Sequence, residues 1–394
     1  MEVIIIIKTE FYKKHEEELR KILIDIKAEL LQETIPFWEE RIVDKVYPGY
    51  LTCYDRKGQL FDTQKPGWFV GRTMYTFSAM YNQIEMKQEW KNIAKIGREM
   101  MEGKFYLGNG RFAQMLNRDG TVKNGAESIF TDHFVVKGFY EYIRTCEYAE
   151  QQKDIRLAEI LSDNLFENVK KDEILQKEGI PEGYQKHAVI DCAEKSLYEF
   201  ANDEYEVPLE YISIEGRPKF EEEGRLVDPG HTMESLWFCM RTGKELGKIQ
   251  YCKRAEKVLD WVIERCYDEE YGGFYQHVDV DGGMKNPRFM VSDYAGKTAA
   301  WDDKIWWVQA EGLYALEMSA LYNENERHYA YFIKMYDYIQ SYFRDKKYGE
   351  WYSILKRDGT IRVADKGFAL KGPYHVPRCL LQSVKLLEIY LNGK

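Results

Sequence analysis

The stretch Tyr374 to Cys379, YHVPRC, places an imidazole and a guanidinium three residues apart, at His375 and Arg378. Pro377 stands between them, and proline suits the first turn of a helix because its missing N–H would have no partner there. Residues three apart on a helix share a face, so both side chains would project together from a helix start. A group that transfers protons beside a fixed cation suits chemistry that passes through an oxyanion.

A second histidine motif, GHTMES, begins at Gly230 and carries His231 and Glu234 three residues apart. The preceding Pro-Gly pair indicates a loop, which predicts that His231 lies at or just before a helix N-terminus. The alternative without a catalytic role is a histidine that caps or packs the helix, with an exposed acid in the first helical turn, where the helix dipole favours an acid.

The motif DDKIWWVQAE, Asp302 to Glu311, combines two tryptophans with polar groups. On a helix one face would carry Lys304, Trp307 and Glu311, and a neighbouring line Trp306 and Gln309. Buried lysine and glutamate need partners, so this set is unusual for a pure core. An indole packs on the apolar face of a sugar ring while carboxylates and amides bind hydroxyls, so we interpret the motif as a sugar site.

Three weaker candidates stand near other predicted helix starts. Arg72 follows Gly71, where its guanidinium could hold an anionic oxygen. His133 comes shortly after Thr131, a possible N-cap, and His187 precedes another predicted helix. Taken alone, each is more often a surface, packing or ion-pairing group.

Composition excludes several classes of function. The chain has 394 residues, a net charge of −10 and no basic patch, which argues against nucleic acid as a partner. The seven cysteines include no CxxC pair, which indicates reduced thiols and no zinc site. No segment approaches a membrane span or a signal sequence, so we predict a cytoplasmic protein. Motifs for dinucleotides, phosphates, zinc peptidases and serine hydrolases are missing. Metal binding by His231, Glu234 and His375 stays open, although nothing in the sequence requires it.

Hairpin motifs recur along the chain and set its organisation. The first set is YDRKGQL, LNRDGTV and LKRDGTI, at 54–60, 116–122 and 355–361, and the second is DEEYGGFY and DKKYGEWY, at 268–275 and 345–352. Turn residues between strand-like flanks predict short β-hairpins, and recurrence of a fixed motif indicates a repeated unit.

Between the hairpins, apolar residues recur with helical spacing. The predicted helices are 11–31, 72–81, 90–101, 130–148, 157–169, 188–200, 233–246, 251–266, 305–322, 329–343 and 378–390. With this helix count and no linker, we predict an all-α, single-domain (α/α)6 barrel over residues 1–394, with the short β-hairpins at one rim. Inner helices of such a ring start at one rim, so side chains at their starts should converge on a pocket.

Together these motifs resemble the N-acylglucosamine 2-epimerase family, which includes cellobiose 2-epimerases and mannose or aldose–ketose isomerases. The resemblance covers nearly the whole chain, from IPFWEE through GWFVGR, GHTMES and DKIWWVQAE to FRDKKYGEW and GPYHVPR. FVGR, YGEW and GPYHVPRC are similar to the N-acylglucosamine 2-epimerase branch, whereas DKIWWVQAE is similar to the cellobiose branch.

The resemblance implies an (α/α)6 barrel and metal-free, reversible inversion at C2 of a reducing sugar, with no required cofactor. His231 and His375 match the two acid/base histidines of the family. Arg72, Glu234 and Glu311 match its pocket residues. Trp306, Trp307 and Arg378 lie in motifs that match those of the family. It also implies a homodimer and, for this branch, ATP as an effector, although no phosphate loop is present.

In the implied reaction, one histidine removes the C2 proton of the open-chain sugar and the other delivers a proton to the opposite face. Arg72 stabilises the enediolate, and Glu234 is expected to orient the imidazole of His231. The expected substrates are N-acetylglucosamine and N-acetylmannosamine. Two departures from the family bear on sugar preference: Tyr47-Pro48-Gly49 replaces a Gly-Gly pair, and Thr131-Asp132-His133 replaces Ser-Glu-x.

Three alternatives remain. A cellobiose or mannose 2-epimerase, or an aldose–ketose isomerase, would use the same residues. A glycoside hydrolase would need two carboxylates, which Glu234 and Glu311 could supply, but both motif histidines would then have no role. A non-catalytic renin-binding-type protein belongs to another class, and the intact histidine pair argues against it.

Overall fold

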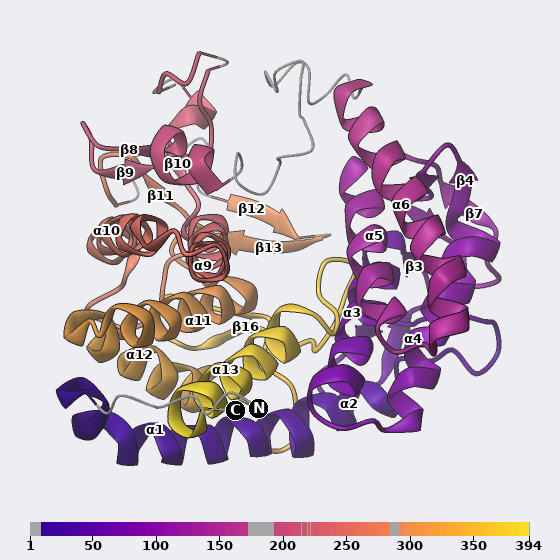
Figure 1. The fold of residues 1–394 in the computed structure, drawn as a ribbon, viewed down its shortest axis with the longest axis horizontal. Coiled ribbons are helices and arrows are strands. Elements are labelled where there is room, and N and C mark those ends of the chain that lie inside the picture. Colours follow the sequence, from indigo (N-terminus) through magenta and orange to yellow (C-terminus); the bar gives the residue numbers. More distant parts are fainter. Residues whose placement is uncertain are drawn as a thin grey trace.

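The computed structural model describes residues 9–171, 193–213, 215–218, 220, 222–283, 291–294 and 296–393, and these residues are mostly helical. An inner layer holds α3 (Gly67–Gln83), α5 (Ile129–Ile143), α9 (Pro229–Glu245), α11 (Trp306–Asn323) and α13 (His375–Asn392). An outer layer holds α1 (Glu10–Glu29), α2 (Ile35–Glu39), α4 (Gln88–Met100), α6 (Tyr148–Lys171), α10 (Ile249–Cys266) and α12 (Glu326–Tyr338) (Figure 1).

The inner helices pack on one another as well as on their outer partners. Helix α3 packs on α5, α9 on α11, α11 on α13, and α13 in turn contacts α3. Helix α11 is apolar nearly all round and buried from Trp306 to Leu321, as expected for a helix covered on every side. The outer helices α4 and α10 each bury one apolar face and expose the other, which is the pattern of a surface layer.

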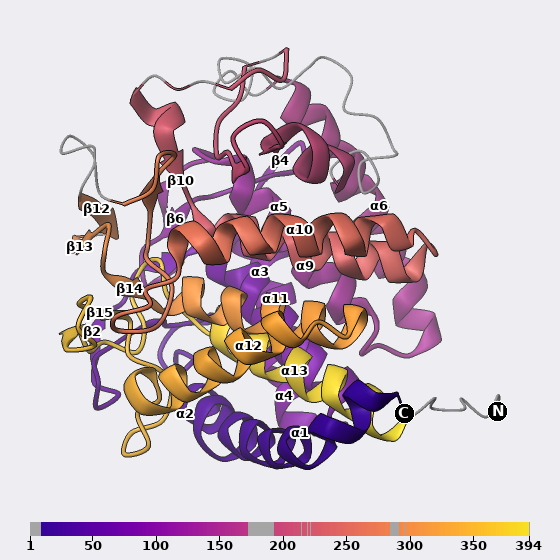
Figure 2. The same ribbon diagram turned by 90° about the vertical axis from the view of Figure 1, so that its left-hand side faces the viewer.

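Short helical turns and strands complete the described elements. The π-helical turns are η1 (Leu30–Thr34), η2 (Met101–Phe105), η3 (Lys195–Phe200) and η6 (Ile339–Phe343), and a 3₁₀ turn is η4 (Glu222–Arg225). The strands are β1 (Cys53–Tyr54), β2 (Leu60–Asp62), β3 (Lys65–Pro66), β4 (Tyr106–Gly108), β5 (Arg111–Phe112), β6 (Met115–Leu116), β7 (Val122–Asn124), β8 (Ala201–Asn202), β9 (Val207–Pro208), β10 (Leu226–Val227), β11 (Val278–Asp279), β12 (Val291–Tyr294), β13 (Lys297–Ala300), β14 (Lys304–Ile305), β15 (Ile354–Leu355) and β16 (Ile361–Val363). They pair antiparallel in sheets of two or three strands, and most gather at one end of the helices (Figure 2).

Helix α3 begins five residues earlier than the predicted helix 72–81, because Gly71 is not a helix boundary. A Cβ on Gly71 would lie 2.0 Å from the carbonyl oxygen of Phe134, and one on Gly138 would lie 2.2 Å from the carbonyl oxygen of Gly71. The two glycines let the backbones of α3 and α5 touch. Arg72 therefore lies in the second turn of α3 and not at its start, which corrects the expectation from sequence.

Each hairpin of the first recurrent set contributes an arginine to a repeated ion-pair group. In every group the arginine donates two hydrogen bonds to a buried aspartate that follows an outer-layer helix, and a buried lysine pairs with the same aspartate. The groups are Arg56–Asp345–Lys366, Arg118–Asp44–Lys65 and Arg357–Asp268–Lys304. In the first group the arginine and aspartate are 289 residues apart, so this contact joins the first hairpin to the last outer helix.

We expect Arg56→Gln to lower the free energy of unfolding by about 1–2 kcal/mol. This is the contribution of a hydrogen bond between charged groups, reduced because Arg56 is 40% exposed and solvent screens its charge. Arg118→Gln breaks the matching contact to Asp44 and should lower the urea midpoint in the same direction. Lys95→Gln removes an exposed pair with Glu99 and serves as the control, expected to change little. Urea denaturation midpoints compare the three, and equal midpoints would contradict a stabilising role for the repeated groups.

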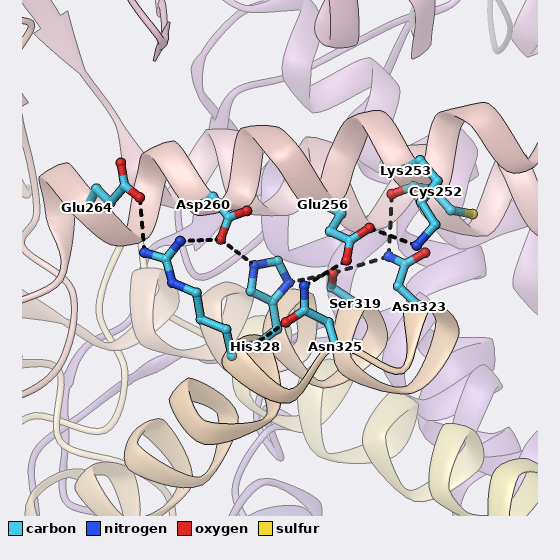
Figure 3. Close-up of polar contacts among 10 residues, drawn as sticks. Cys252, Lys253, Glu256, Asp260, Glu264, Ser319, Asn323, Asn325 and His328 are labelled. Atoms are coloured by element: carbon cyan, nitrogen blue, oxygen red, sulfur yellow. Dashed lines mark hydrogen bonds and ion pairs between the residues drawn. The ribbon is translucent and has the colours of Figure 1, made fainter. Parts of the chain in front are cut away.

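A second polar cluster joins α10, α11 and α12 on the outer side of the molecule (Figure 3). His328 lies between Ser319, 2.7 Å from Nδ1, and Asp260, 3.1 Å from Nε2. A serine, histidine and aspartate in this order resemble a nucleophilic triad. Ser319 and His328 are fully buried, however, and Asn325 caps α12 while its amide donates to Glu256 on α10. The cluster therefore fixes one helix to another and offers no access to a substrate.

Within the described ranges, no helix is both long and apolar enough to cross a membrane.

Candidate functional site

The two motif histidines lie at the starts of two inner helices, as predicted. Asp228 caps α9 by accepting a hydrogen bond from the backbone N–H of His231 at 2.9 Å. His375 is the first residue of α13, with Pro377 in the first turn. Helix α11 lies next to both α9 and α13, so its start stands between the two histidines.

Trp307, at the start of α11, is the wall that both histidines share. Its ring centroid lies 5.1 Å from that of His231 and 5.7 Å from that of His375. A Cβ on Gly230 would lie 2.4 Å from this indole, so only glycine leaves room for the ring at that point. The side chain of His231 is 56% exposed, so its imidazole is accessible.

The tautomer of His375 follows from its neighbours. Its Nδ1 lies 2.7 Å from Oε1 of Glu311, which also accepts from Arg378 at 2.5 Å, while Oε2 accepts from the indole of Trp237 at 2.8 Å. Both oxygens of Glu311 thus already accept a hydrogen bond from another donor, so we assign His375 as the donor to Oε1 through Nδ1–H. Its Nε2 then carries a lone pair, which is the form that a general base needs.

Arg378 joins the acidic groups of the site and is itself fully buried. It donates to Glu234 at 2.6 Å and, through its other terminal nitrogen, to the hydroxyl of Tyr374 at 2.9 Å. Lys137 on α5 donates to the same hydroxyl at 2.6 Å. Burial works to raise the pKa of Glu234, but Arg378 outweighs it and the pKa is lowered, so Glu234 is ionised.

Glu234, Glu311 and His375 have ligand atoms within 4.8 Å of one another, a spacing that could hold a metal ion. One nitrogen of Arg378 already lies among them, bonded to both carboxylates and 3.4 Å from Nδ1 of His375. A cation at this point would have to displace the guanidinium. The three groups are therefore arranged to bind Arg378.

Arg72 is a buried cation held by aromatic rings. Its guanidinium carbon lies 3.9 Å from the ring centroid of Phe134, 4.8 Å from that of Tyr374 and 5.3 Å from that of Trp68. Its Nε is buried without a hydrogen-bond partner among the described residues. Burial lowers the pKa of Arg72 to about 10, so it keeps its charge at neutral pH. A desolvated guanidinium of this kind is a receptor for an oxyanion.

The surroundings of the two histidines displace their pKa values in opposite directions. Burial and then the guanidinium groups of Arg72 and Arg378 lower the pKa of His375 well below its usual range. Desolvation also acts against a charged His231, but the carboxylates of Asp228, Glu210 and Glu234 outweigh it and raise the pKa to about 10. At neutral pH the site therefore pairs a neutral imidazole with an imidazolium, a base with an acid.

Comparison with known proteins shows the family of the chain. The sequence profile of N-acylglucosamine 2-epimerase (GlcNAc 2-epimerase) matches residues 49–178 and 182–379. The chain belongs to the N-acylglucosamine 2-epimerase family. It is similar to the bovine (Bos taurus) N-acylglucosamine 2-epimerase, with 27% identity over 96% of this chain and 94% of that protein. It is also similar to the cellobiose 2-epimerase of Bacteroides fragilis, with 22% identity over 91% of this chain and 97% of that protein.

Solved structures support the fold. The cellobiose 2-epimerase of Bacillus thermoamylovorans superposes with a TM-score of 0.74 and 15% identity, covering 93% of this chain and all of that one. A D-mannose isomerase superposes with a TM-score of 0.73 and 16% identity, covering 92% of this chain and 98% of that one. Family membership makes the chain an isomerase of the epimerase type.

Within this epimerase, three residues of the motif 302–311 have described contacts with neighbouring hairpins. Helix α11 begins at Trp306, so Lys304 is in β14 and not on the helical face of Trp307. Lys304 pairs with Asp268, and Gln309 is bonded through both ends of its amide to the backbone of Phe274. The ring of Trp306 packs edge-on against Phe368. Their described contacts hold hairpins to α11 and are not with either histidine.

The other candidate site residues are Glu234, His133 and His187, and the structure describes the first two. Glu234 bonds Arg378 and not His231, so the expectation that Glu234 orients this imidazole is wrong, although its charge helps to raise the pKa. His133 is exposed on the first turns of α5, with its ring beside Phe134. His187 lies outside the described residues, as does part of the predicted helix 188–200.

Sequence reasoning missed several residues of the site. Trp237 stands three residues after Glu234, so helical spacing alone would have placed it on the same face. Tyr374 belongs to the YHVPRC motif but was given no role. Lys137 and Glu210 stand in no motif, and they reach the site only through the packing of separate elements.

Proposed function

We propose that the chain is a sugar 2-epimerase that interconverts N-acetylglucosamine and N-acetylmannosamine. The observation that carries the proposal is the histidine pair on either side of Trp307, with pKa values displaced in opposite directions. Inversion at one carbon requires a base on one face and an acid on the other, and we assign these roles to His375 and His231.

The reaction starts once the sugar ring has opened. Nε2 of His375 takes the proton from C2, and the electron pair of that C–H bond moves toward C1 so that the carbonyl oxygen becomes an enolate oxyanion, with the acetamido group still on C2. Arg72 receives this oxyanion, since its charge is met only by aromatic rings among its described contacts. Nε2–H of His231 then gives its proton to the opposite face of C2, and the carbonyl re-forms. The transfer leaves His375 protonated and His231 neutral, which is the state that the reverse reaction starts from, and proton exchange with water restores the resting charges.

The choice of an N-acetylhexosamine rests on the greater identity to the bovine N-acylglucosamine 2-epimerase than to the Bacteroides cellobiose 2-epimerase, 27% against 22% over similar spans. A cellobiose or mannose 2-epimerase and an aldose–ketose isomerase remove the C2 proton in the same way, and because their sugars carry a hydroxyl at C2 the intermediate is an enediolate. In the isomerase the proton returns to C1 instead of C2.

A glycoside hydrolase is not favoured by the same geometry. Such an enzyme needs one carboxylic acid that is protonated near neutral pH. Glu234 and Glu311 both accept hydrogen bonds from one nitrogen of Arg378, and the pKa of Glu234 is lowered. Neither is set up as a proton donor.

We also infer that residues 1–394 form one catalytic domain with the (α/α)6 barrel architecture. The inner layer of α3, α5, α9, α11 and α13, with α13 returning to α3, supports this, as do the hairpins at one end. We expect activity without an added cofactor, with ATP as an effector at most.

Proton NMR in D₂O tests the function, with N-acetylmannosamine, N-acetylglucosamine, cellobiose or mannose as substrate and with or without ATP. We expect deuterium at C2 together with the epimer of an N-acetylhexosamine. A ketose product would assign the chain to the isomerases, and epimerised cellobiose or mannose would change the substrate. No exchange at C2 with any of these sugars would refute the epimerase proposal.

A further inference from the structure

The carboxylate that bonds the ring of His231 comes from a loop that no sequence motif contains. Glu210 follows β9, and its Oε1 lies 2.9 Å from Nδ1 of His231. The loop is anchored, because β9 packs on α10 and Arg254 of α10 donates to the carbonyl oxygens of Leu197 and Ala201 at 2.7 and 3.0 Å. Glu210 is therefore presented to His231 from a fixed element.

Asp228 and His277 complete the surroundings of the same nitrogen. Oδ2 of Asp228 lies 3.5 Å from Nδ1 of His231 and 3.5 Å from Nδ1 of His277. His277 is buried, and burial keeps its pKa below the usual value, so it brings no positive charge at neutral pH. Glu234 on α9 is the third carboxylate that acts on His231, and Trp307 of α11 covers one side of its ring.

The two histidines thus have the same contact with opposite consequences. Each has a carboxylate at Nδ1: Glu210 for His231 and Glu311 for His375. Glu311 shares its charge with Arg378, whereas the hydrogen bonds described for Glu210 go to His231 alone. An uncompensated carboxylate favours the imidazolium, and one already neutralised by a guanidinium does not.

We propose that Glu210 is a positioning residue for His231: it holds the ring so that Nε2 faces the site, and it keeps the imidazole protonated for transfer to C2. The second half of this statement rests on the proposed function. The contact between Glu210 and His231, and its effect on the charge of the imidazole, do not depend on it.

Glu210→Gln tests the proposal, since the amide oxygen can still accept from Nδ1–H while the charge is removed. In histidine-labelled protein without substrate, NMR titration should show the pKa of His231 falling by about 1–3 units from its high value. Loss of the proton from His231 ends activity at high pH, so a lower pKa moves the alkaline limb of the kcat profile down by the same amount. At pH 7, KM should stay unchanged and kcat within a few-fold.

Glu210→Ala removes orientation as well as charge, so kcat should fall at least about tenfold across the pH range, again without a change in KM. Glu204→Gln, an exposed acid on the turn between β8 and β9, is the matched control and should change neither the titration nor the profile. A His231 titration that is the same in Glu210→Gln and wild type would overturn the proposal. So would a Glu210→Ala variant with wild-type kcat. If the wild-type protein exchanged no sugar at C2, the proposed function would fail while the titration still decided the contact.

Discussion

Replacing His231 or His375 by asparagine is expected to lower epimer formation about 10²–10⁴-fold for each variant, with the fold unchanged. Asparagine keeps an N–H that can donate to Glu210 or Glu311, the carboxylates at Nδ1. It has no group that takes up or releases a proton near neutral pH. The loss should therefore appear in kcat, since the contacts that hold the sugar remain.

NMR integration of the two epimers measures this loss, and circular dichroism checks the fold. His15→Asn is the control. His15 lies on the outer helix α1 and is bonded to Glu326 on the outer helix α12, so it belongs to the outer layer and not to the site. That variant should turn over at the wild-type rate. A His231 or His375 variant that kept turnover within about tenfold of wild type would rule out a mechanism with two histidine acid/base groups.

The positions of His231 and His375 could be predicted from the sequence because the residues that indicate a helix start stand next to each histidine. A Pro-Gly pair before His231 and a proline after His375 both indicate helix starts, and both histidines do lie in the first turn of a helix, although the helices begin at Pro229 and His375 and so before the predicted ranges 233–246 and 378–390. Trp307 and Glu311 could be placed together for the same reason, since their spacing falls within one helix. Family resemblance added the proposed roles to these positions.

The sequence could not assign partners that come from distant segments. Lys304 and Gln309 read as binding groups because buried polar side chains need partners, but those partners are Asp268 and the backbone of Phe274 in a preceding hairpin. The predicted helix boundary at Gly71 was wrong for a related reason. This glycine allows close contact between α3 and α5, and no local sequence pattern distinguishes a glycine at a helix contact from a glycine in a turn. Glu210 is the clearest case, since nothing near it in the sequence connects it to His231.

Arg72→Met is expected to separate activity from stability. Removing the guanidinium should lower kcat about 10²–10³-fold, the cost of losing one donor to a developing oxyanion. The folded protein should lose little, because methionine fills the space among Phe134, Tyr374 and Trp68, and no carboxylate is left behind. The lost cation–π contacts and the removed desolvation cost oppose each other, so the free energy of unfolding should change by no more than about 1 kcal/mol.

Arg378→Met is the matched contrast, because this arginine does have carboxylate partners. Its removal leaves Glu234 and Glu311 facing each other beside His375 without a cation, and breaking a buried pair in this way costs about 3–5 kcal/mol. Both activity and the urea midpoint should therefore fall. If Arg72→Met lost as much stability as Arg378→Met, Arg72 would be a structural cation. If Arg72→Met kept its kcat, the enolate would have to be stabilised by another donor, and Lys137 with Tyr374 would be the group to examine next.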